Sequence, residues 1–356
     1  MAKHIVCLTF DFDGISGFVA RGSPSPSPVS RGEFGPRVAA PRLLALFKKY
    51  RIKTSWYVPG HTIESFPDAV KAVVDHGHEI GHHGWRHISP VAFSRAEEEE
   101  ELIRGNESIK RISGEYARGY RSPGWDLSPH SVELFIKHGF TYDSSMMGDD
   151  YGMYYARQGD VLDLHKPAQF GETTSLVELP ISWSTDDSPH FEYMRTGNAL
   201  RPGLASAGDV LENWIADFDY MQKTTEWGVL TFTCHPFISG RGHRIMMLEK
   251  LIRHMKDKGA VFQRADQTVL EFRQRTSGNT APKVRRNRGR AVQSGIVNRS
   301  IGSWPRFSRS MRHRVSAESN NIQPTEKKND QKDCSWNGGR GGVGWRFGFG
   351  AMVRRW

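Results

Sequence analysis

The feature that most constrains the fold is an alternation of short apolar runs with longer amphipathic stretches, which continues to about residue 275. The short runs, such as HIVCLTF and KTSWYV, are rich in β-branched and aromatic residues, which is typical of buried strands. The longer stretches repeat their apolar residues at helical spacing. Strands that alternate with helices indicate parallel strands joined by helical crossovers, so the sequence predicts an α/β protein.

The expected elements follow one another closely along this part of the chain. Strands are expected at 4–10, 53–58, 78–82, 117–121, 175–183, 228–236 and 260–263. Helices are expected at 36–50, 63–77, 95–112, 208–224 and 243–259, with another beginning at Ser128 and a last one ending near Arg273. The serine–proline run 23–28 is expected to form an extended loop. Because neither a GxGxxG nor a Walker-type loop follows the first strand, a (β/α) barrel is favoured over a nucleotide-binding sheet.

The net charge of +10 lies in the last part of the chain. Residues 281–356 hold 17 Lys/Arg and 4 Asp/Glu, whereas residues 1–280 hold 32 basic and 35 acidic residues. From Ser277 onward, segments such as NGGRGGVGWRFGFG show no periodicity. We therefore expect a folded domain of residues 1–276 and a disordered basic Gly/Arg-rich tail of residues 277–356. A nucleic-acid-binding tail and an out-of-frame translation product are the alternatives for this tail.

The cysteines and the hydropathy pattern bear on the compartment. Cys7, Cys234 and Cys334 lie far apart and make no disulfide framework, and a small buried thiol is the expectation for Cys234. The start of the chain lacks an apolar signal region, and no stretch approaches the roughly 18 apolar residues that span a membrane. These features predict a cytoplasmic protein without a membrane partner.

Two overlapping metal-site spacings occur in HEIGHHGWRH, residues 78–87. An HExxH zinc site requires a helix, but residues 78–82 follow a glycine-terminated helix and contain Ile80 and Gly81, which favour a strand. In the alternative HxxxH spacing, one helical turn would place His83 and His87 on the same side. The second spacing is therefore the predicted metal site.

The end of the first strand supplies the acidic groups that two histidines alone lack. Asp11 and Asp13 are two residues apart in TFDFDG, so one carboxylate can bind a metal while the other handles a proton. Two histidines and one aspartate leave open positions for water and substrate, as a catalytic metal site requires.

Several separate motifs, TFDFDG, HHGWRH, RSPGW and LTFTCHP, occur in this order and together resemble those of the polysaccharide deacetylase (NodB-homology) family. The similarity is closest to a cytoplasmic branch with peptidoglycan deacetylase-like, allantoinase and cyclic imide hydrolase members, in which the GEFG segment (32–35) and the PISW–DD segment (180–187) also recur. The resemblance covers about residues 4–275. It implies a distorted TIM-like (β/α) barrel and a homo-oligomer, such as a tetramer.

The resemblance also implies a role for each matching residue. The metal ligands would be Asp13, His83 and His87, holding a divalent metal for which Zn²⁺ is favoured and Co²⁺ is the alternative. Asp11 would be the general base and Arg121 its partner. His235 would be the general acid, oriented by Asp186 or Asp187, and the match does not decide between the two aspartates. The oxyanion hole and the substrate contacts are assigned to Gly124, Trp125 and Glu33.

These roles together predict a metal-dependent hydrolase of non-peptide C–N amide bonds. The favoured reaction is N-deacetylation of an N-acetylated carbohydrate. The ring-opening hydrolysis of a small cyclic amide, an imide or a ureide, is the alternative within the same chemistry. The alternative of another class is a non-catalytic barrel whose tail binds nucleic acid.

Overall fold

The computed structural model describes residues 2–196, 199–201 and 203–277, all within the first of the two units, 1–285 and 286–356, into which the chain divides. The expected disorder of the tail and the position of Cys334 lie outside the described residues.

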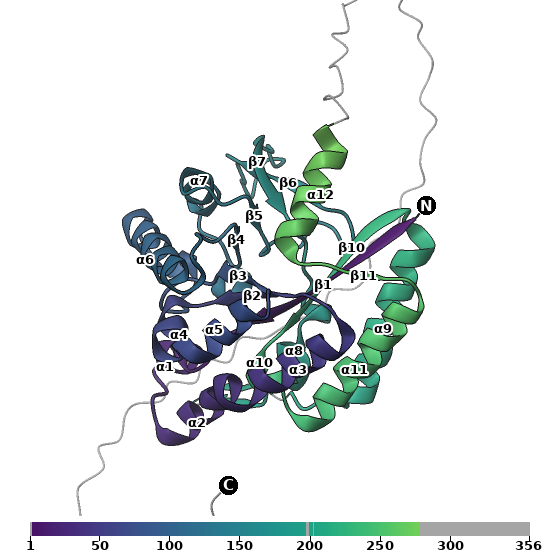
Figure 1. Cartoon of the computed structure of the whole chain (residues 1–356). Helices are drawn as coiled ribbons and strands as arrows, with labels where there is room; N and C mark the ends of the chain where they lie inside the picture. Colours follow the sequence, from purple (N-terminus) through teal and green to yellow (C-terminus); the bar gives the residue numbers. More distant parts are fainter. Residues whose placement is uncertain (1, 197–198, 202, 278–356) are drawn as a thin grey trace, which may run out of the picture. The chain divides into compact units, whose positions relative to one another are not determined.

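A curled, mostly parallel sheet forms the centre of the described part (Figure 1). The strands, in the order in which they pair, are β10 (Trp227–Cys234), β1 (Lys3–Asp11), β2 (Ser55–Val58), β3 (Glu79–His82), β4 (Gly119–Tyr120), β5 (Tyr142–Asp143), β7 (Glu172–Glu178) and β6 (Tyr154–Gln158). Only β6 is antiparallel to its neighbour among these described strands. A short strand, β11 (Val261–Phe262), pairs with the first half of β1. This arrangement confirms the predicted α/β fold with a barrel-like sheet.

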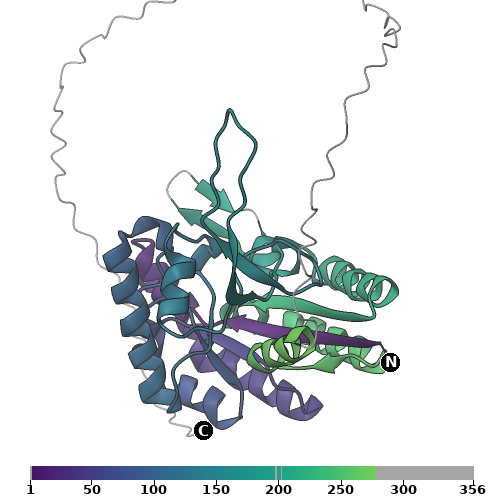
Figure 2. The same ribbon diagram turned by 90° about the horizontal axis from the view of Figure 1, so that it is seen from above.

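Helices connect the strands and cover the outside of the curled sheet (Figures 1 and 2). The α-helices are α1 (Ser16–Ala20), α2 (Pro26–Phe34), α3 (Ala40–Tyr50), α4 (Gly60–Ser65), α5 (Pro67–Asp75), α6 (Arg95–Ser113), α7 (Ser131–Lys137), α8 (Asp187–Phe191), α9 (Ala207–Thr224), α10 (Pro236–Ser239), α11 (Gly242–Asp257) and α12 (Ala265–Ser277). The longest of these, α6, begins with a capping box between Ser94 and Glu97 and ends at Gly114, which has a positive φ. Large fully buried side chains from β1, β2 and the helices, including Phe10, Trp56 and Trp214, form the core.

Local sequence explains where the structure departs from the expected helices. The serine–proline run was expected to be a loop, but α2 begins at Pro26, because proline fits the first helical turn after the extended Ser25. Helix α2 then continues through a π-helical segment, Gly35–Ala39, into α3. The helix expected at 63–77 is instead divided between α4 and α5 at Phe66–Pro67, since Pro67 has no N–H for a helical hydrogen bond.

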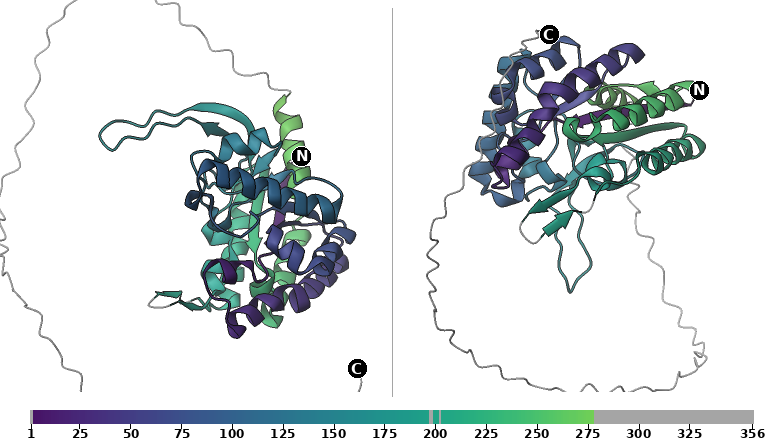
Figure 3. Two further views of the ribbon diagram at one scale, coloured as in Figure 1. Left: turned by 90° about the vertical axis from the view of Figure 1, so that its left-hand side faces the viewer. Right: turned by 90° about the horizontal axis from the view of Figure 1, so that it is seen from below.

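Three strand features were absent from the sequence-based expectation. Strand β5 has two residues, β6 lies at the end of the sheet, and β8 (Met194–Thr196) pairs with β9 (Ala199–Arg201) as a separate hairpin. The connection between β6 and β7 projects from the rest of the described part as a long hairpin (Figures 2 and 3). Such short or exposed strands carry too few alternating residues to give a clear period-two pattern.

Candidate metal centre and active site

The predicted site residues come together at the carboxyl ends of the parallel strands. Asp11 ends β1, His83 follows β3, Arg121 follows β4 and His235 follows β10. Parallel strands present these ends at the same edge of the sheet, which is where barrel enzymes place their chemistry. A cavity of about 340 Å³ opens there, and it is lined by Asp11, Asp13, His83, His87 and His235 together with residues of the later loops.

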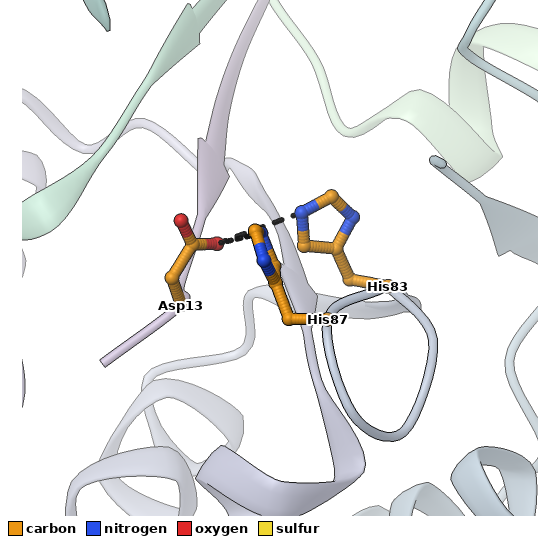
Figure 4. A group of neighbouring side chains, drawn as sticks. All are labelled: Asp13, His83 and His87. Atoms are coloured by element: carbon orange, nitrogen blue, oxygen red, sulfur yellow. Dashed lines mark ion pairs between the residues drawn. The ribbon is translucent and has the colours of Figure 1, made fainter. Parts of the chain in front are cut away.

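Asp13, His83 and His87 form a compact group of possible metal ligands (Figure 4). The Oδ1 atom of Asp13 lies 3.2 Å from Nε2 of His87 and 3.5 Å from Nε2 of His83. The Nδ1 atom of His83 lies 2.7 Å from the carbonyl oxygen of Arg121. A proton on Nδ1 would donate to that carbonyl and leave the Nε2 lone pair directed at Asp13.

The backbone that presents the two histidines differs from the expected helical turn. Residues 83–87 form a bent loop in which Gly84 has φ +69° and His87 has φ +58°. The sharp left-handed turns, rather than a helical period, bring the two imidazoles together. The helical turn was therefore a wrong prediction, although the pair of residues is the expected one.

The competing HExxH spacing is not a metal site in this fold. His78 is buried, and its Nδ1 accepts a hydrogen bond from the backbone N–H of Thr54 at 3.0 Å. Glu79 instead accepts a hydrogen bond from Tyr142, with 2.8 Å between the two oxygens. His82 packs against α6, where its Nε2 lies 3.1 Å from the carbonyl oxygen of Leu102. The strand expected at 78–82 is confirmed as β3, in which alternation turns Glu79 and His82 to opposite faces and the extended backbone keeps His78 and His82 apart.

The chemistry of the three candidate ligands fits a divalent metal ion. Within the described part of the chain, the buried Oδ1 atom of Asp13 has no hydrogen-bond partner. Burial alone would raise the pKa of this carboxyl group, but His87 and His83 lower the pKa well below its ordinary range, so the group stays ionised. One carboxylate oxygen and two imidazole nitrogens are ligands that zinc and similar metals accept in catalytic sites.

Arg121 fixes the second carboxylate, Asp11. Its guanidinium is fully buried, and Nη1 donates to Oδ1 of Asp11 and to Oγ1 of Thr9, at 2.8 Å in both cases. The opposite side of the guanidinium donates to Ser144, through Nε to the carbonyl oxygen at 3.0 Å and through Nη2 to Oγ at 2.9 Å. A buried ion pair with this many hydrogen bonds holds the Asp11 side chain in one orientation.

Asp187 is the aspartate that orients His235. The Nδ1 atom of His235 lies 2.7 Å from Oδ1 of Asp187 but 3.7 Å from Oδ1 of Asp186. Asp187 also accepts hydrogen bonds from the backbone N–H of His235 at 2.9 Å and from Oγ of Ser239 at 2.5 Å. Burial would lower the pKa of His235, but the Asp187 carboxylate raises it well above its ordinary value. Asp186 lines the cavity, and burial raises its pKa to about 7.

Two of the three residues assigned to substrate contacts line the cavity. Gly124 and Trp125 lie in a tight turn in which both residues have positive φ, +74° and +61°. The Trp125 ring stacks on Trp183 with 4.1 Å between the ring centroids, so the two indoles form one wall of the cavity.

Glu33, the third residue assigned to substrate contacts, is not among the described residues that line the cavity, and it pairs with Arg37 on the surface at 3.2 Å. The helical course of α2 turns Gly32 rather than Glu33 toward the site. A Cβ atom on Gly32 would lie 2.6 Å from the carbonyl oxygen of Gly14, so this glycine permits close packing against the loop that carries Asp13.

Several other residues that line the cavity were not expected from any sequence pattern. These are Arg21, Ser188, Pro189, Glu192 and Phe237. Glu192 is almost fully buried and pairs with Arg31 of α2 at 2.5 Å. Only Phe237 had a usable signal, since it lies two residues after His235. The others reach the cavity through loops whose course no periodic pattern reveals.

Several known proteins resemble this chain in sequence, in fold or in both. Residues 2–142 match the family model described as polysaccharide deacetylase. The peptidoglycan deacetylase of Helicobacter pylori is 39% identical over 269 residues, which is 72% of this chain and 91% of that protein. A Mycobacterium smegmatis structure assigned to the polysaccharide deacetylases is 29% identical, with a TM-score of 0.69 over 77% of this chain and 92% of that chain. Puue allantoinase, at 20% identity and a TM-score of 0.62 over 77% of this chain and 91% of that chain, shares the fold.

Proposed function

Because the chain belongs to the polysaccharide deacetylase family, we propose that it removes the acetyl group from an N-acetylated carbohydrate with the help of a divalent metal ion. The observation that carries the proposal is the convergence of three groups on one cavity. These groups are the ligand set Asp13, His83 and His87, the Arg121-bound carboxylate of Asp11, and the Asp187-bound imidazole of His235.

The proposed roles follow from the surroundings of each side chain. Asp13, His83 and His87 would hold the metal, which when bound supplies a Lewis acid that polarises the amide carbonyl and lowers the pKa of water. Asp11 accepts the proton of the attacking water, because its pairing with Arg121 holds the carboxylate in place at the cavity. His235 donates a proton to the departing amine, because Asp187 keeps the imidazole protonated at neutral pH. The indole wall of Trp125 and Trp183 offers an apolar surface to a sugar ring.

We further propose Zn²⁺ as the metal, with Co²⁺ as a functional substitute, because mixed nitrogen and oxygen ligands suit both ions. A homo-oligomer, with a tetramer as the expected state, remains our proposal for the assembly, and size-exclusion chromatography with light scattering tests it.

In the described part of the chain, no helix is long and apolar enough to cross a membrane. Cys7 and Cys234 are both buried and unpaired, which supports our proposal of a reducing, cytoplasmic compartment.

Mass spectrometry of reaction products tests the proposed function. The purified full chain is incubated with N-acetylglucosamine oligomers and, in parallel, with cyclic imides, hydantoins and allantoin. Each reaction is run as purified, after chelation, and after restoration with Zn²⁺ or Co²⁺. We expect loss of acetyl groups from the oligomers, abolished by the chelator and restored by metal. Gain of one water on a ring substrate, without deacetylation of any oligomer, would replace the proposal with ring-opening hydrolysis.

The comparisons give less support to the alternatives. The likeness to Puue allantoinase, at 20% identity, is a likeness of fold alone. The relative that is 39% identical is a peptidoglycan deacetylase. The nucleic-acid-binding tail falls on residues outside the described part of the chain. A non-catalytic barrel would not require the paired and oriented side chains that line the cavity.

A further inference from the structure

Two buried carboxyl groups lie side by side behind the active site. Asp143 ends β5 and Glu178 ends β7, and the two residues are direct partners in the register of these neighbouring parallel strands. Both residues are 0% exposed. The backbone N–H of Ser145 donates to Oδ2 of Asp143 at 3.1 Å and to Oε1 of Glu178 at 3.0 Å, so both groups approach one donor.

The charge of this pair is not balanced by an ion pair in the described part of the chain. Within the described part of the chain, neither carboxyl group forms an ion pair with Lys, Arg or His. The titratable groups that face the pair from neighbouring strands are the phenols of Tyr120 on β4 and Tyr154 on β6, which are uncharged at neutral pH. Two adjacent, fully buried carboxylates that lack a cationic partner would repel each other strongly, so one proton must remain between them.

The hydrogen bonds indicate which group holds the proton. Asp143 accepts two hydrogen bonds from Ser145, from the backbone N–H to Oδ2 and from the hydroxyl to Oδ1 at 2.8 Å. Oε1 of Glu178 accepts from the backbone N–H groups of Ser145 and Met146, the latter at 2.8 Å. The fourth carboxyl oxygen of the pair is Oε2 of Glu178, which accepts no hydrogen bond from the described residues. A proton on Oε2 would make this atom a hydrogen-bond donor.

The pair connects directly to the active site through the loop after β5. The Ser145 hydroxyl donates to Asp143, so its oxygen is oriented to accept the backbone N–H of Ser122 at 2.9 Å. The preceding residue, Ser144, receives two hydrogen bonds from the Arg121 guanidinium. Asp143 therefore fixes the loop that holds both Arg121 and the start of the turn that leads to Gly124.

We propose that Glu178 is protonated and donates to ionised Asp143, and that this proton-sharing pair positions Arg121 and the turn at Gly124 for catalysis. Burial raises the pKa of Asp143 to about 6 and the pKa of Glu178 well above its ordinary value, in agreement with the geometry. The link to catalysis rests on the proposed function, whereas the sharing of the proton does not. Both residues are positioning residues, because they act through Ser144 and Ser145 rather than on the substrate.

The pH dependence of stability tests the protonation without any activity assay. Because the folded-state pKa of Glu178 is raised, its stabilising contribution is fully present below the unfolded value of about 4.5 and is lost as pH rises toward the folded value. Glu178→Gln is a neutral mimic that keeps the donor, so it should remove this dependence. We expect the unfolding equilibrium constant of the wild type to rise with pH by up to tenfold per unit more than that of E178Q.

Chemical denaturation of the full chain, at about pH 5 and about pH 8, measures this difference. E178Q should be nearly as stable as the wild type at the lower pH and more stable at the higher pH. Equal pH slopes for the two proteins would overturn the proposal. As a measurement that needs no variant to be active, infrared spectroscopy of the wild type at neutral pH should show a protonated carboxyl C=O band that E178Q lacks. Absence of this band would also overturn the proposal.

Kinetics of three variants test the positioning role. E178Q should keep kcat within about threefold of the wild type. Asp143→Asn places an amide N–H₂ where a hydrogen-bond acceptor is needed. Ser145→Ala removes the hydroxyl that accepts a hydrogen bond from the backbone N–H of Ser122. Both variants should lower kcat at least about tenfold with little change in KM. S145A should keep the pH slope of wild-type stability, because it leaves the carboxyl pair intact. A loss in E178Q as large as in D143N would contradict the assignment of the proton. If the wild type deacetylates no substrate, the proposed function fails while the stability and infrared results still decide the proton's position.

Discussion

At the scale of single residues, the site separates the roles of two aspartates that lie only two positions apart. Asp11 faces a guanidinium that is locked on its other side by Ser144, whereas Asp13 faces two imidazoles and keeps one oxygen without a hydrogen bond. Phe12, between them, points into the core and is fully buried. Because residues two apart in an extended chain face the same side, both carboxylates face the cavity while Phe12 faces the core, and their different neighbours separate their roles.

Asp11→Asn should reduce turnover by about 10²- to 10⁴-fold, because the amide cannot accept the proton of the attacking water. Metal content, measured by mass spectrometry of the purified protein, should stay the same, since the Asp13, His83 and His87 cluster is unchanged. Asp13→Asn is the matched variant, and it should lose metal as well as activity. Unchanged turnover in D11N would exclude Asp11 as the base.

Asp187→Asn should shift the pH–rate profile, because the carboxylate of Asp187 raises the pKa of His235. The acid form of His235 is present below its pKa and is lost as pH rises through it. Removing the charge lowers this pKa, so the alkaline limb of kcat should move to lower pH, with a lower maximum. Asp186→Asn, whose Oδ1 atom is 3.7 Å from Nδ1 of His235, should move this limb less. Equal shifts in the two variants would refute the specific role of Asp187.

The sequence identified the site residues that lie at the ends of strands, but it could not distinguish between neighbouring candidates within a loop. Asp11 and His235 were identifiable, because each lies at the end of an apolar run and parallel strands bring such ends together. The choice between Asp186 and Asp187 depends on how their loop lies against β10, where Asp186 bridges to Thr233 and the next residue turns to His235. Glu33 lies outside the residues that line the cavity, and the residue of its motif that packs against the loop carrying Asp13 is the neighbouring Gly32.

At the scale of elements, helix α2 supports the loop that carries Asp13 through one close contact. Gly32 lies against the Gly14 carbonyl and the Ile15 Cα, at distances that leave no room for a Cβ atom. Arg31, the preceding residue, reaches Glu192 on the other side of the cavity. Helix α2 therefore connects the loop after β1 with the segment after α8, although its proline-rich sequence resembles a linker.

Gly32→Ala should destabilise the protein by about 1–3 kcal/mol, because the added methyl group would lie 2.6 Å from the Gly14 carbonyl oxygen and would displace the helix or the loop. The same displacement should weaken metal binding, measured by competition with a chelator. Gly242→Ala, at the start of α11, is the control, since a Cβ atom there has nothing within 4 Å. It should change stability by less than about 0.5 kcal/mol. Similar losses in both variants would show that close packing at Gly32 is not the cause.

The elements that were predicted well are those with long periodic patterns. Helix α6 was expected at 95–112 and spans Arg95–Ser113, and α9 was expected at 208–224 and spans Ala207–Thr224. Strand β5 was missed because two residues cannot show alternation, and its place is set by pairing with β4 and β7. The bent loop at 83–87 depends on positive φ at His87, which no helical or strand pattern indicates.

At the scale of the whole molecule, the proposed chemistry uses only residues between Asp11 and Ser239, but the barrel requires the chain up to α12. The side chains of Ala265, Val269 and Phe272 belong to a buried cluster with Ile5 and Val229 of β1 and β10. Lys3 at the start of β1 pairs with Glu271 of α12 at 2.5 Å. Helix α12 thus covers the strand that carries Asp11 at its other end.

A chain that ends at residue 277 should therefore keep the deacetylase activity and the thermal midpoint of the full chain, which would support our proposed boundary near residue 276. A chain that ends at residue 264 is the matched control. It lacks α12, so the apolar side chains that pack against Val269 and Phe272 would be exposed to water, at a cost of about 1.5–3 kcal/mol for each large side chain lost. We expect this shorter chain to aggregate or to melt well below the longer one in calorimetry. Loss of activity in the chain ending at residue 277, with its thermal midpoint retained, would instead show that residues 278–356 contribute to the reaction.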